Sequence, residues 1–505
     1  MSRIWKLTLV ICVFLLMSGC NGSMVAPTVA PTFVLTDTLI TIPTVPPSAT
    51  PTSTPLLVPT AERNALVALY EATAGQNWDR SDGWLSDQSV CTWEDITCAS
   101  GHVIEVNLRK NNLQGTLPPE IGQLTSLQHL DLHDNQLTAL PLEFGRLTSL
   151  QELYLWDNQL TALPLEFGQL TNLRHLYLSN NQLTELLPGI GQLTSLRELS
   201  LSNNQLTDLP PAIGQLTSLQ RLFLSDNQLT KLPPEFGKLI NLQILKLSNN
   251  QLAELPSEFG QLTSLQELYL WDNQLSTLPP EFGQLTNLRK LSLDNNQLTQ
   301  LPPEFGQLIN LQDLKLSNNR LTELPPEFGQ LTSLQELYLW SNQLSMLPPE
   351  FGQLTNLREP WLDNNQLTEL PPEFGHLISL QKLHLDNNQL AELPPEIGQL
   401  TSLHGLSLGN NRLTKLPPEI GQLTKLESLT LSNNQITELP LEFGQLANLQ
   451  WLSLDSNQLT NLPLEFGQLT KLESLTLSSN RLIGLPLETC RNVRYIDIRQ
   501  ELCGK

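Results

Sequence analysis

The sequence predicts an α/β repeat solenoid, and three observations lead to this fold class. Asparagine recurs every 23 residues from Asn135 to Asn480, and Asn111 precedes that series by 24 residues, which makes seventeen units. Most units contain a Leu-x-Leu stretch, and alternate side chains of a short strand point to opposite faces. A single unit cannot bury its own leucines, so stacked units must share one core. We therefore expect one long array built around a parallel β-sheet.

The strand half of each unit follows the pattern LxxLxLxxNxL, which one unit shows as Leu150, Leu153, Leu155, Asn158 and Leu160. This pattern resembles that of the leucine-rich repeat family. The resemblance implies a curved horseshoe with a parallel β-sheet on its concave face and short helical turns on its convex side. We place the array of seventeen units at residues 103–484.

The rest of each unit also has an expected role. The recurring asparagine is buried but polar, so backbone groups of adjoining loops must satisfy its amide. The segment LPPEFGQLT is expected to form the outer wall, because proline fixes φ and the glutamate is favoured near the N-terminus of a helical turn. The Phe or Ile after that glutamate is expected to point inward and form a packing column.

Residues 1–20, MSRIWKLTLVICVFLLMSGC, predict a signal peptide for export. They combine a basic start, an apolar run over Leu7–Met17 and small residues before Cys20. The ending MSGC resembles the bacterial lipobox, which implies cleavage before Cys20 and a lipid on its thiol. We therefore expect an exported lipoprotein, anchored at the bacterial cell surface or envelope. The alternative is an ordinary secretory signal that contains a cysteine.

Residues 21–60 predict a disordered stalk. They contain eight Pro, ten Thr and one charged residue, Asp37, so no core can form. Proline at this density holds a chain extended, at about 3.1 Å per residue. The apolar run before Cys20 is shorter than the roughly 20 residues that a membrane-spanning helix needs, and no later segment qualifies. Membrane attachment is therefore expected through the lipid alone.

Residues 61–102 are expected to cap the first unit, because a solenoid exposes apolar surface at each end. Thr60 is expected to cap a helix that carries Leu66, Leu69 and Tyr70 on one face and that Gly75 ends. The following tryptophans and the stretch CTWEDITC resemble the N-terminal cap of plant-type extracellular leucine-rich repeat proteins. In that family, two paired cysteines and several tryptophans cover the first strand.

The four cysteines after the signal form two local pairs, one beside each end of the array: Cys91 with Cys98, and Cys490 with Cys503. In an exported protein such pairs predict disulfides, although four cysteines allow three connectivities. The alternative is a zinc site, which needs four ligands close together, whereas the array separates the pairs. Residues 485–505 are expected to close the array, with Ile496 and Ile498 in place of strand leucines, and no effector domain is expected after them.

Charge and motifs exclude several functions. The net charge of −22 opposes phosphate backbones and anionic lipid surfaces, so nucleic acid is not expected as a partner. The repeats contain no nucleophile with its base, no phosphate-binding glycine loop and no calcium loop, so we expect neither an enzyme nor a cofactor. His129, Asp131 and His133 share one strand and suggest a metal site, but residues i and i+4 of a strand lie about 13 Å apart, too far to share one ion easily.

Aromatic residues at outward strand positions are the candidate binding residues. The candidates are Tyr154, Trp156, Tyr177, Phe223, Tyr269, Trp271, Tyr338, Trp340 and Trp361. Trp451 also lies at an outward strand position but is not among the candidates. In adjoining units, Tyr154 with Tyr177 and Tyr338 with Trp361 should stack side by side. The alternative is that these rings only fill the curvature, because residues 246–315 repeat closely 69 positions later and some rings are explained as duplication copies.

Pro360 breaks the repeat. It takes a strand leucine position, which removes a core side chain and a hydrogen-bond donor from a parallel sheet. We expect a local bulge or weakened strand pairing there.

Aromatic side chains on a rigid surface are favoured anchors for protein partners. The sequence thus predicts a monomeric, non-catalytic surface recognition protein that binds a protein or peptide through the concave face. A glycan or cell-wall polymer bound by the same rings is one alternative. A purely structural spacer is the other.

Overall fold

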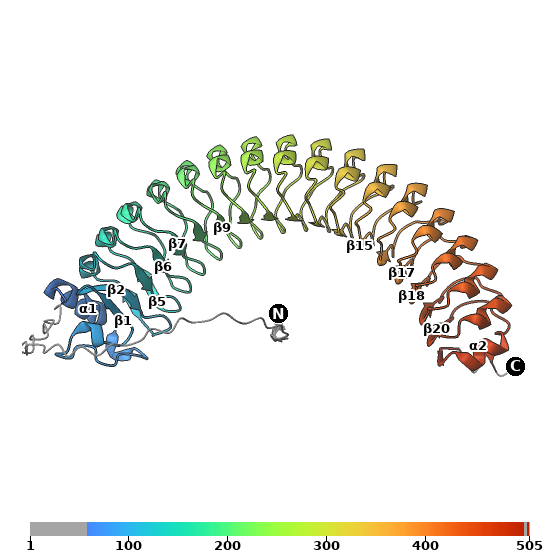
Figure 1. Ribbon diagram of the computed structural model, residues 1–505, viewed down its shortest axis with the longest axis horizontal. Coiled ribbons are helices and arrows are strands. Elements are labelled where there is room, and N and C mark those ends of the chain that lie inside the picture. Colours follow the sequence, from blue (N-terminus) through green and yellow to red (C-terminus); the bar gives the residue numbers. More distant parts are fainter. Residues whose placement is uncertain (1–57, 499–501, 504–505) are drawn as a thin grey trace, which may run out of the picture. The chain divides into compact units, whose positions relative to one another are not determined.

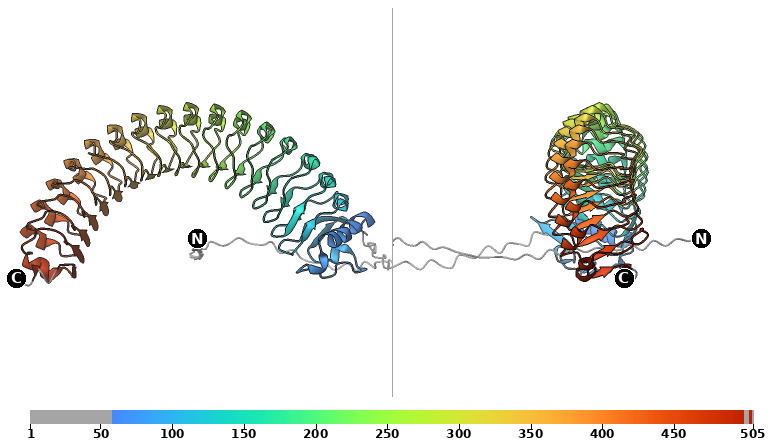
Figure 2. Two further views of the ribbon diagram at one scale, coloured as in Figure 1. Left: turned by 180° about the vertical axis from the view of Figure 1, so that it is seen from behind. Right: turned by 90° about the vertical axis from the view of Figure 1, so that its right-hand side faces the viewer.

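The computed structural model describes residues 58–498 and 502–503. The expected signal peptide, the lipidation residue Cys20 and nearly all of the expected stalk therefore lie outside the described residues. The described chain is a curved array in which short strands line the concave side and short helical turns line the convex side (Figures 1 and 2). This arrangement confirms the α/β solenoid expected from the 23-residue period.

One nineteen-stranded sheet runs through the described residues. From β2 to β21 each strand is parallel to the strand of the next unit, and Leu153, for example, lies opposite Leu176. The first strand is antiparallel to the second. The strands are β1 (Ile96–Ala99), β2 (His102–Asn107), β4 (His129–Asp131), β6 (Glu152–Tyr154), β7 (His175–Tyr177), β8 (Glu198–Ser200), β9 (Arg221–Phe223), β10 (Ile244–Lys246), β11 (Glu267–Tyr269), β12 (Lys290–Ser292), β13 (Asp313–Lys315), β14 (Glu336–Tyr338), β15 (Glu359–Trp361), β16 (Lys382–His384), β17 (Gly405–Ser407), β18 (Ser428–Thr430), β19 (Trp451–Ser453), β20 (Ser474–Thr476) and β21 (Tyr495–Ile496).

The convex wall consists of 3₁₀ turns that begin at or just after proline and run from η3 (Pro119–Gln123) to η18 (Leu464–Gln468). The phenylalanines of these turns are buried and stack in parallel, with ring centroids of Phe259 and Phe282 6.2 Å apart. This confirms the expected packing column. Glycine is required in the same turns, because a Cβ on Gly283 would lie 2.2 Å from the carbonyl oxygen of Glu304 in the next unit.

The asparagine column binds each unit to the one before it. The Asn273 amide donates to the carbonyl oxygens of Leu247 and Leu270, both at 3.0 Å, and its oxygen accepts the Leu252 N–H at 3.0 Å. The same ladder recurs along the array, so the expected backbone partners are confirmed. The residue before each asparagine adopts positive φ, as Asp272 does at 53°, and Asn, Asp or Ser occupies that column in every unit after the first, which has Lys110.

The N-terminal cap differs from the prediction at both ends of its helix. Helix α1 (Thr60–Ala72) has Pro59 at its N-cap position, so Thr60 is the first helical residue and makes no capping bond. The helix ends at Ala72, before Gly75, and Ala74 follows with a left-handed φ of 58°, which a helix cannot continue through. The buried positions of Leu66 and Leu69 agree with the predicted face.

Rings and disulfides complete the two ends. Trp84 lies between Trp78 and Trp93, at centroid distances of 4.9 and 5.1 Å, and the three rings are buried. Both predicted disulfides are present, Cys91 with Cys98 and Cys490 with Cys503. At the C-terminal end, helix α2 (Leu487–Asn492) precedes β21, in which Ile496 lies opposite Leu475 and takes the place of a strand leucine.

Pro360 weakens the sheet on one side only. Strand β15 stays in register with β14 at three positions, including Leu337 opposite Pro360. On its other side it pairs with β16 at a single position, Trp361 opposite His384. The weakened pairing is confirmed, and it arises because proline has no N–H to donate. The register on the β14 side is unshifted.

Candidate functional site

The candidate aromatic residues lie on the concave face. Tyr154 and Trp156 are partly exposed, whereas Leu153 and Leu155 beside them are fully buried. All nine candidate rings are partly exposed, and Trp451 is exposed by 47%. Each ring is therefore partly covered by the protein and partly accessible to a partner. The described residues group most of these rings into three clusters along the array.

The first cluster spans β4, β6 and β7. The rings of Tyr154 and Tyr177 stack with centroids 5.0 Å apart and planes within 8°, which confirms the predicted pair. Trp156 stacks at 4.0 Å on His133, whose Nδ1 lies 2.6 Å from Asp131 Oδ1. Burial and the hydrogen bond to Glu152 raise the pKa of the Tyr154 hydroxyl.

The two histidines of the suggested metal site face different partners. Glu152 lies between His129 and His175 of the adjoining strands, at 3.1 and 3.6 Å from their Nδ1 atoms. His133 turns instead to Asp131 and Trp156. Among residues 58–498 and 502–503, no three His, Cys, Asp or Glu side chains converge in a way that could hold a metal ion.

The second cluster places a cation between rings. The Lys246 ammonium lies 5.2 Å from the Phe223 centroid and 5.6 Å from that of Tyr269. Such contacts are attractive because the ring face carries negative charge. The Tyr269 hydroxyl donates to Glu267 at 2.9 Å, and burial together with this bond raises its pKa to about 12. Trp271 lies next to Tyr269 along the chain at the following outward position.

The third cluster encloses a hollow of about 560 Å³, which we call the concave pocket. It is lined by Tyr338, Trp340, Trp361, Asp363, Asn364, His384, Asp386 and Asn387. Trp361 and His384 stack face to face at 3.7 Å, and Tyr338 lies 6.2 Å from Trp361, so the second predicted ring pair is also confirmed.

Two carboxylates of the concave pocket were missed by sequence reasoning. Asp363 Oδ1 accepts the N–H of Asp386 at 2.8 Å, and Asp386 Oδ1 accepts the N–H of Gly409 at 2.5 Å. Burial raises the pKa of both carboxyls, because a low-polarity surrounding disfavours the charged form. The sequence signal for these carboxylates was their position: Asp363 and Asp386 each stand two residues after an outward ring, Trp361 or His384, and lie one unit apart.

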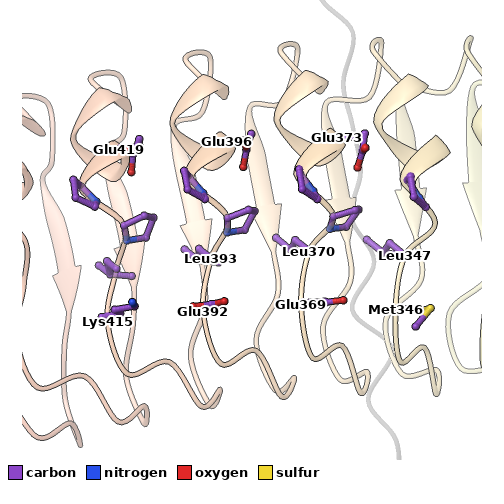
Figure 3. A pocket seen from close by; sticks show the side chains of 18 residues that line it. Met346, Leu347, Glu369, Leu370, Glu373, Glu392, Leu393, Glu396, Lys415 and Glu419 are labelled. Atoms are coloured by element: carbon purple, nitrogen blue, oxygen red, sulfur yellow. The ribbon is translucent and has the colours of Figure 1, made fainter.

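A second hollow lies on the flank of the array, between the sheet and the outer turns (Figure 3). It has a volume of about 1120 Å³ and is formed by the Leu-Pro-Pro segments of successive units. Glu373, Glu396 and Glu419 form one row along it, and Glu369, Glu392 and Lys415 belong to a second row (Figure 3). This flank is apart from the aromatic clusters of the concave face.

Family models of leucine-rich repeats match most of the array. The model described as a leucine-rich repeat region matches residues 102–205, 187–302 and 397–493. A second leucine-rich repeat model matches residues 286–344 and 332–390. Among the described residues, no helix is long and apolar enough to span a bilayer.

Solved structures and curated sequences that resemble this chain include other leucine-rich repeat proteins and receptor kinases. A leucine-rich repeat protein of Leptospira interrogans is 43% identical, with a TM-score of 0.63, and the match covers 78% of this chain and 95% of that chain. The Arabidopsis receptor kinase HAESA, solved with the peptide hormone IDA and the co-receptor SERK1, is 27% identical, covers 86% and 79% of the two chains and has a TM-score of 0.61. A probable inactive leucine-rich repeat receptor-like protein kinase of Arabidopsis thaliana is 35% identical over 73 residues, which is 14% of this chain and 11% of that relative's length.

Proposed function

Because the chain belongs to the leucine-rich repeat family, we propose that it is a rigid recognition protein whose concave face binds a protein or peptide partner. The observation that carries this proposal is the grouping of partly exposed rings into three clusters along one face. Stacking holds these rings in place before a partner arrives, which lowers the entropy cost of binding. The mechanism is binding by a monomer, without a chemical step or a cofactor.

The similar receptor HAESA supports a peptide as the ligand, since it was solved with a peptide hormone. Peptides should therefore be selected from a displayed random library on the immobilised full chain. Selected peptides are then measured against Trp156→Ser, Trp271→Ser and Trp340→Ser. A serine stands at equivalent outward positions in other units, such as Ser202, so these variants keep the strand intact.

The matched control is Leu165→Ser, which removes an apolar side chain that is 68% exposed in a 3₁₀ turn of the outer wall. We expect at least one tryptophan variant to lower affinity about tenfold or more, since buried aromatic anchors contribute about 2 kcal/mol or more. The control should leave affinity unchanged. If the selected peptides bind the three tryptophan variants as tightly as the control variant and the natural chain, the concave face is not the binding surface.

We further propose that the chain is an exported lipoprotein with its lipid on Cys20, a stalk over residues 21–60 and the cap and array beyond it. The sequence of residues 1–60 supports this part of the proposal. Labelling cells with a radioactive fatty acid should mark the natural chain and not Cys20→Ala. Equal labelling of both chains would contradict the proposed anchor.

A glycan is the second candidate ligand, and one observation favours it. Tyr154 and Tyr177 form a stacked pair of nearly parallel rings, with planes within 8°, and aromatic rings are the groups on which sugar faces stack. Binding on a glycan array that a soluble oligosaccharide competes away, and that Tyr154→Ser and Tyr177→Ser abolish, would support this candidate over a peptide.

A further inference from the structure

The concave pocket has an internal counterpart in the same chain. Residues 290–317 and 359–386 are related by a shift of 69 positions, and both contain the sequence LDNNQLT followed by LPPEFG. Asp294 and Asp363 are equivalent in this alignment. The concave face differs at the following equivalent pairs: Lys290 and Glu359, Ser292 and Trp361, Asp313 and Lys382, Lys315 and His384, Ser317 and Asp386.

These differences change the local charge. In the earlier block, burial raises the pKa of Asp294 and of Asp313, and the Lys315 ammonium acts to lower both, while Lys290 lies 3.4 Å from Glu267. In the later block, Lys382 Nζ lies 3.3 Å from Glu359 Oε1 and forms an ion pair with that carboxylate. The pocket carboxylates Asp363 and Asp386 have no lysine or arginine within ion-pair distance among the described residues.

A histidine stands where the earlier block has a lysine. Its charged form acts to lower the pKa of Asp363 and of Asp386, but an imidazole is a weaker cation at neutral pH than the ammonium group of a lysine. The ring of His384 lies flat on Trp361 at 3.7 Å. Its Nε2 is 3.4 Å from Glu359 Oε1, without the geometry of a hydrogen bond, and is buried. The later block therefore carries a ring and a carboxylate that the earlier block lacks, and it lacks an ammonium group at the position of Lys315.

We propose that the concave pocket binds the guanidinium group of an arginine side chain carried by the partner, an inference that rests on the proposed function. A guanidinium is planar, so it can stack on Trp340, beside the edge of Trp361, while its N–H groups donate to Asp363 and Asp386. The same face already holds the Lys246 ammonium against two rings, at 5.2 and 5.6 Å. The Lys315 ammonium likewise lies 5.3 Å from the Tyr338 centroid, whereas Trp340 and the two carboxylates take their cation from outside.

A neutral sugar fits the pocket less well. Its hydroxyls would bond to the two carboxylates but would leave their charge uncompensated in a partly desolvated site. An anionic group would meet Asp363 and Asp386 directly. Charge complementarity therefore favours a cation, and the flat, paired rings favour the guanidinium over the compact ammonium of lysine.

The test is calorimetric titration of the full chain with acetyl-Gly-Arg-Gly-amide and with its citrulline counterpart, which keeps the shape of arginine without its charge. The variants are Trp361→Ser, His384→Lys and Asp386→Ser, each of which installs the residue that the earlier block carries. These residues already fold in equivalent strands of this protein. The matched control is Asp272→Ser, because Ser341 stands at the equivalent position one block later.

We expect the arginine peptide to bind at least tenfold more tightly than the citrulline peptide. His384→Lys should abolish the difference, because it supplies an internal cation, and Asp386→Ser and Trp361→Ser should each weaken arginine binding about tenfold, which corresponds to about 1.4 kcal/mol. The control should bind as the natural chain does.

Three results would overturn the inference. These are equal binding of arginine and citrulline, equal binding of a lysine peptide, and displacement of the arginine peptide by a neutral oligosaccharide. Failure here is distinct from failure of the proposed function. If library-selected peptides lose affinity on Trp156→Ser or Trp271→Ser but not on Asp386→Ser, the concave face still binds the partner and only the guanidinium assignment is wrong.

Discussion

Replacing Asn273 with alanine tests whether the asparagine column holds the units together. Asn273 is 8% exposed and forms bonds of 3.0 Å with the carbonyls of Leu247 and Leu270 and with the N–H of Leu252. A buried hydrogen bond contributes about 1 kcal/mol net, so the three bonds together predict a loss of about 3 kcal/mol. Alanine offers no replacement, and water cannot reach the groups left behind.

The matched control is Asn287→Ala in the next unit. Asn287 is exposed and makes a single bond of 2.8 Å to the carbonyl of Thr263, so its loss should cost about 1 kcal/mol or less. Both variants remove the same amide from the same array. The difference between them isolates the effect of burial and of the number of bonds.

The assay combines urea unfolding with hydrogen exchange at single amides, because repeat arrays unfold through nearest-neighbour coupling and a single midpoint is incomplete. Asn273→Ala should lower the unfolding midpoint and speed exchange at the Leu252 amide before amides of distant units. The reasoning is refuted if the two variants differ by less than about 1 kcal/mol. It is also refuted if exchange rises evenly along the array.

Three further predictions concern packing, the cap and pH. Gly283→Ala should destabilise by about 1 to 3 kcal/mol in urea unfolding through overpacking, because its Cβ would meet a backbone oxygen at 2.2 Å, whereas Gly405→Ala, whose Cβ would meet only a flexible lysine at 3.6 Å, should be nearly neutral. Replacing both Cys91 and Cys98 by serine opens a short disulfide loop and should cost about 2.5 kcal/mol, measured as loss of exchange protection in α1 before any change in the central units. Asp386→Asn should raise the melting temperature at pH 7. Burial raises the pKa of this carboxyl in the folded state, so its contribution to stability is lost as pH rises through that pKa. The gain in melting temperature should vanish below about pH 4, and a gain that persists there would contradict burial as the cause.

The fold could be predicted from sequence because the 23-residue period leaves one way to bury the leucines. Alternation across Leu153 and Leu155 fixes which side chains face inward, and the next unit supplies the neighbour at a known distance along the chain. The stacked pairs Tyr154 with Tyr177 and Tyr338 with Trp361 follow from the same register. They are local consequences of one repeated geometry.

Features that break the repeat were harder to predict. The start of α1 was misplaced because Thr60 matches the residue preference for a helix cap, while the competing Pro59 already supplies an extended φ of −54° and ψ of 139°. The concave pocket was missed for another reason. The burial of outward polar residues such as Asp363 and Asp386 depends on the size of the side chains one unit before and after them, which the repeat pattern does not specify.

The internal duplication bears on whether the rings are only inherited copies. A copy that merely filled the curvature would be expected to keep its compensating charge, because a partly buried carboxylate without an ion-pair partner lowers stability. The later block instead carries Asp386 where the earlier block has Ser317, and His384 where it has Lys315. Burial raises the pKa of Asp386, so its charged form at neutral pH is held at a cost in stability. Asp386 thus destabilises the free protein while it faces the concave pocket. A cation that enters this pocket would explain why such a residue is present. Removing its charge should therefore stabilise the free protein and weaken the complex, and the two opposite effects of one substitution separate a binding role from mere filling of space.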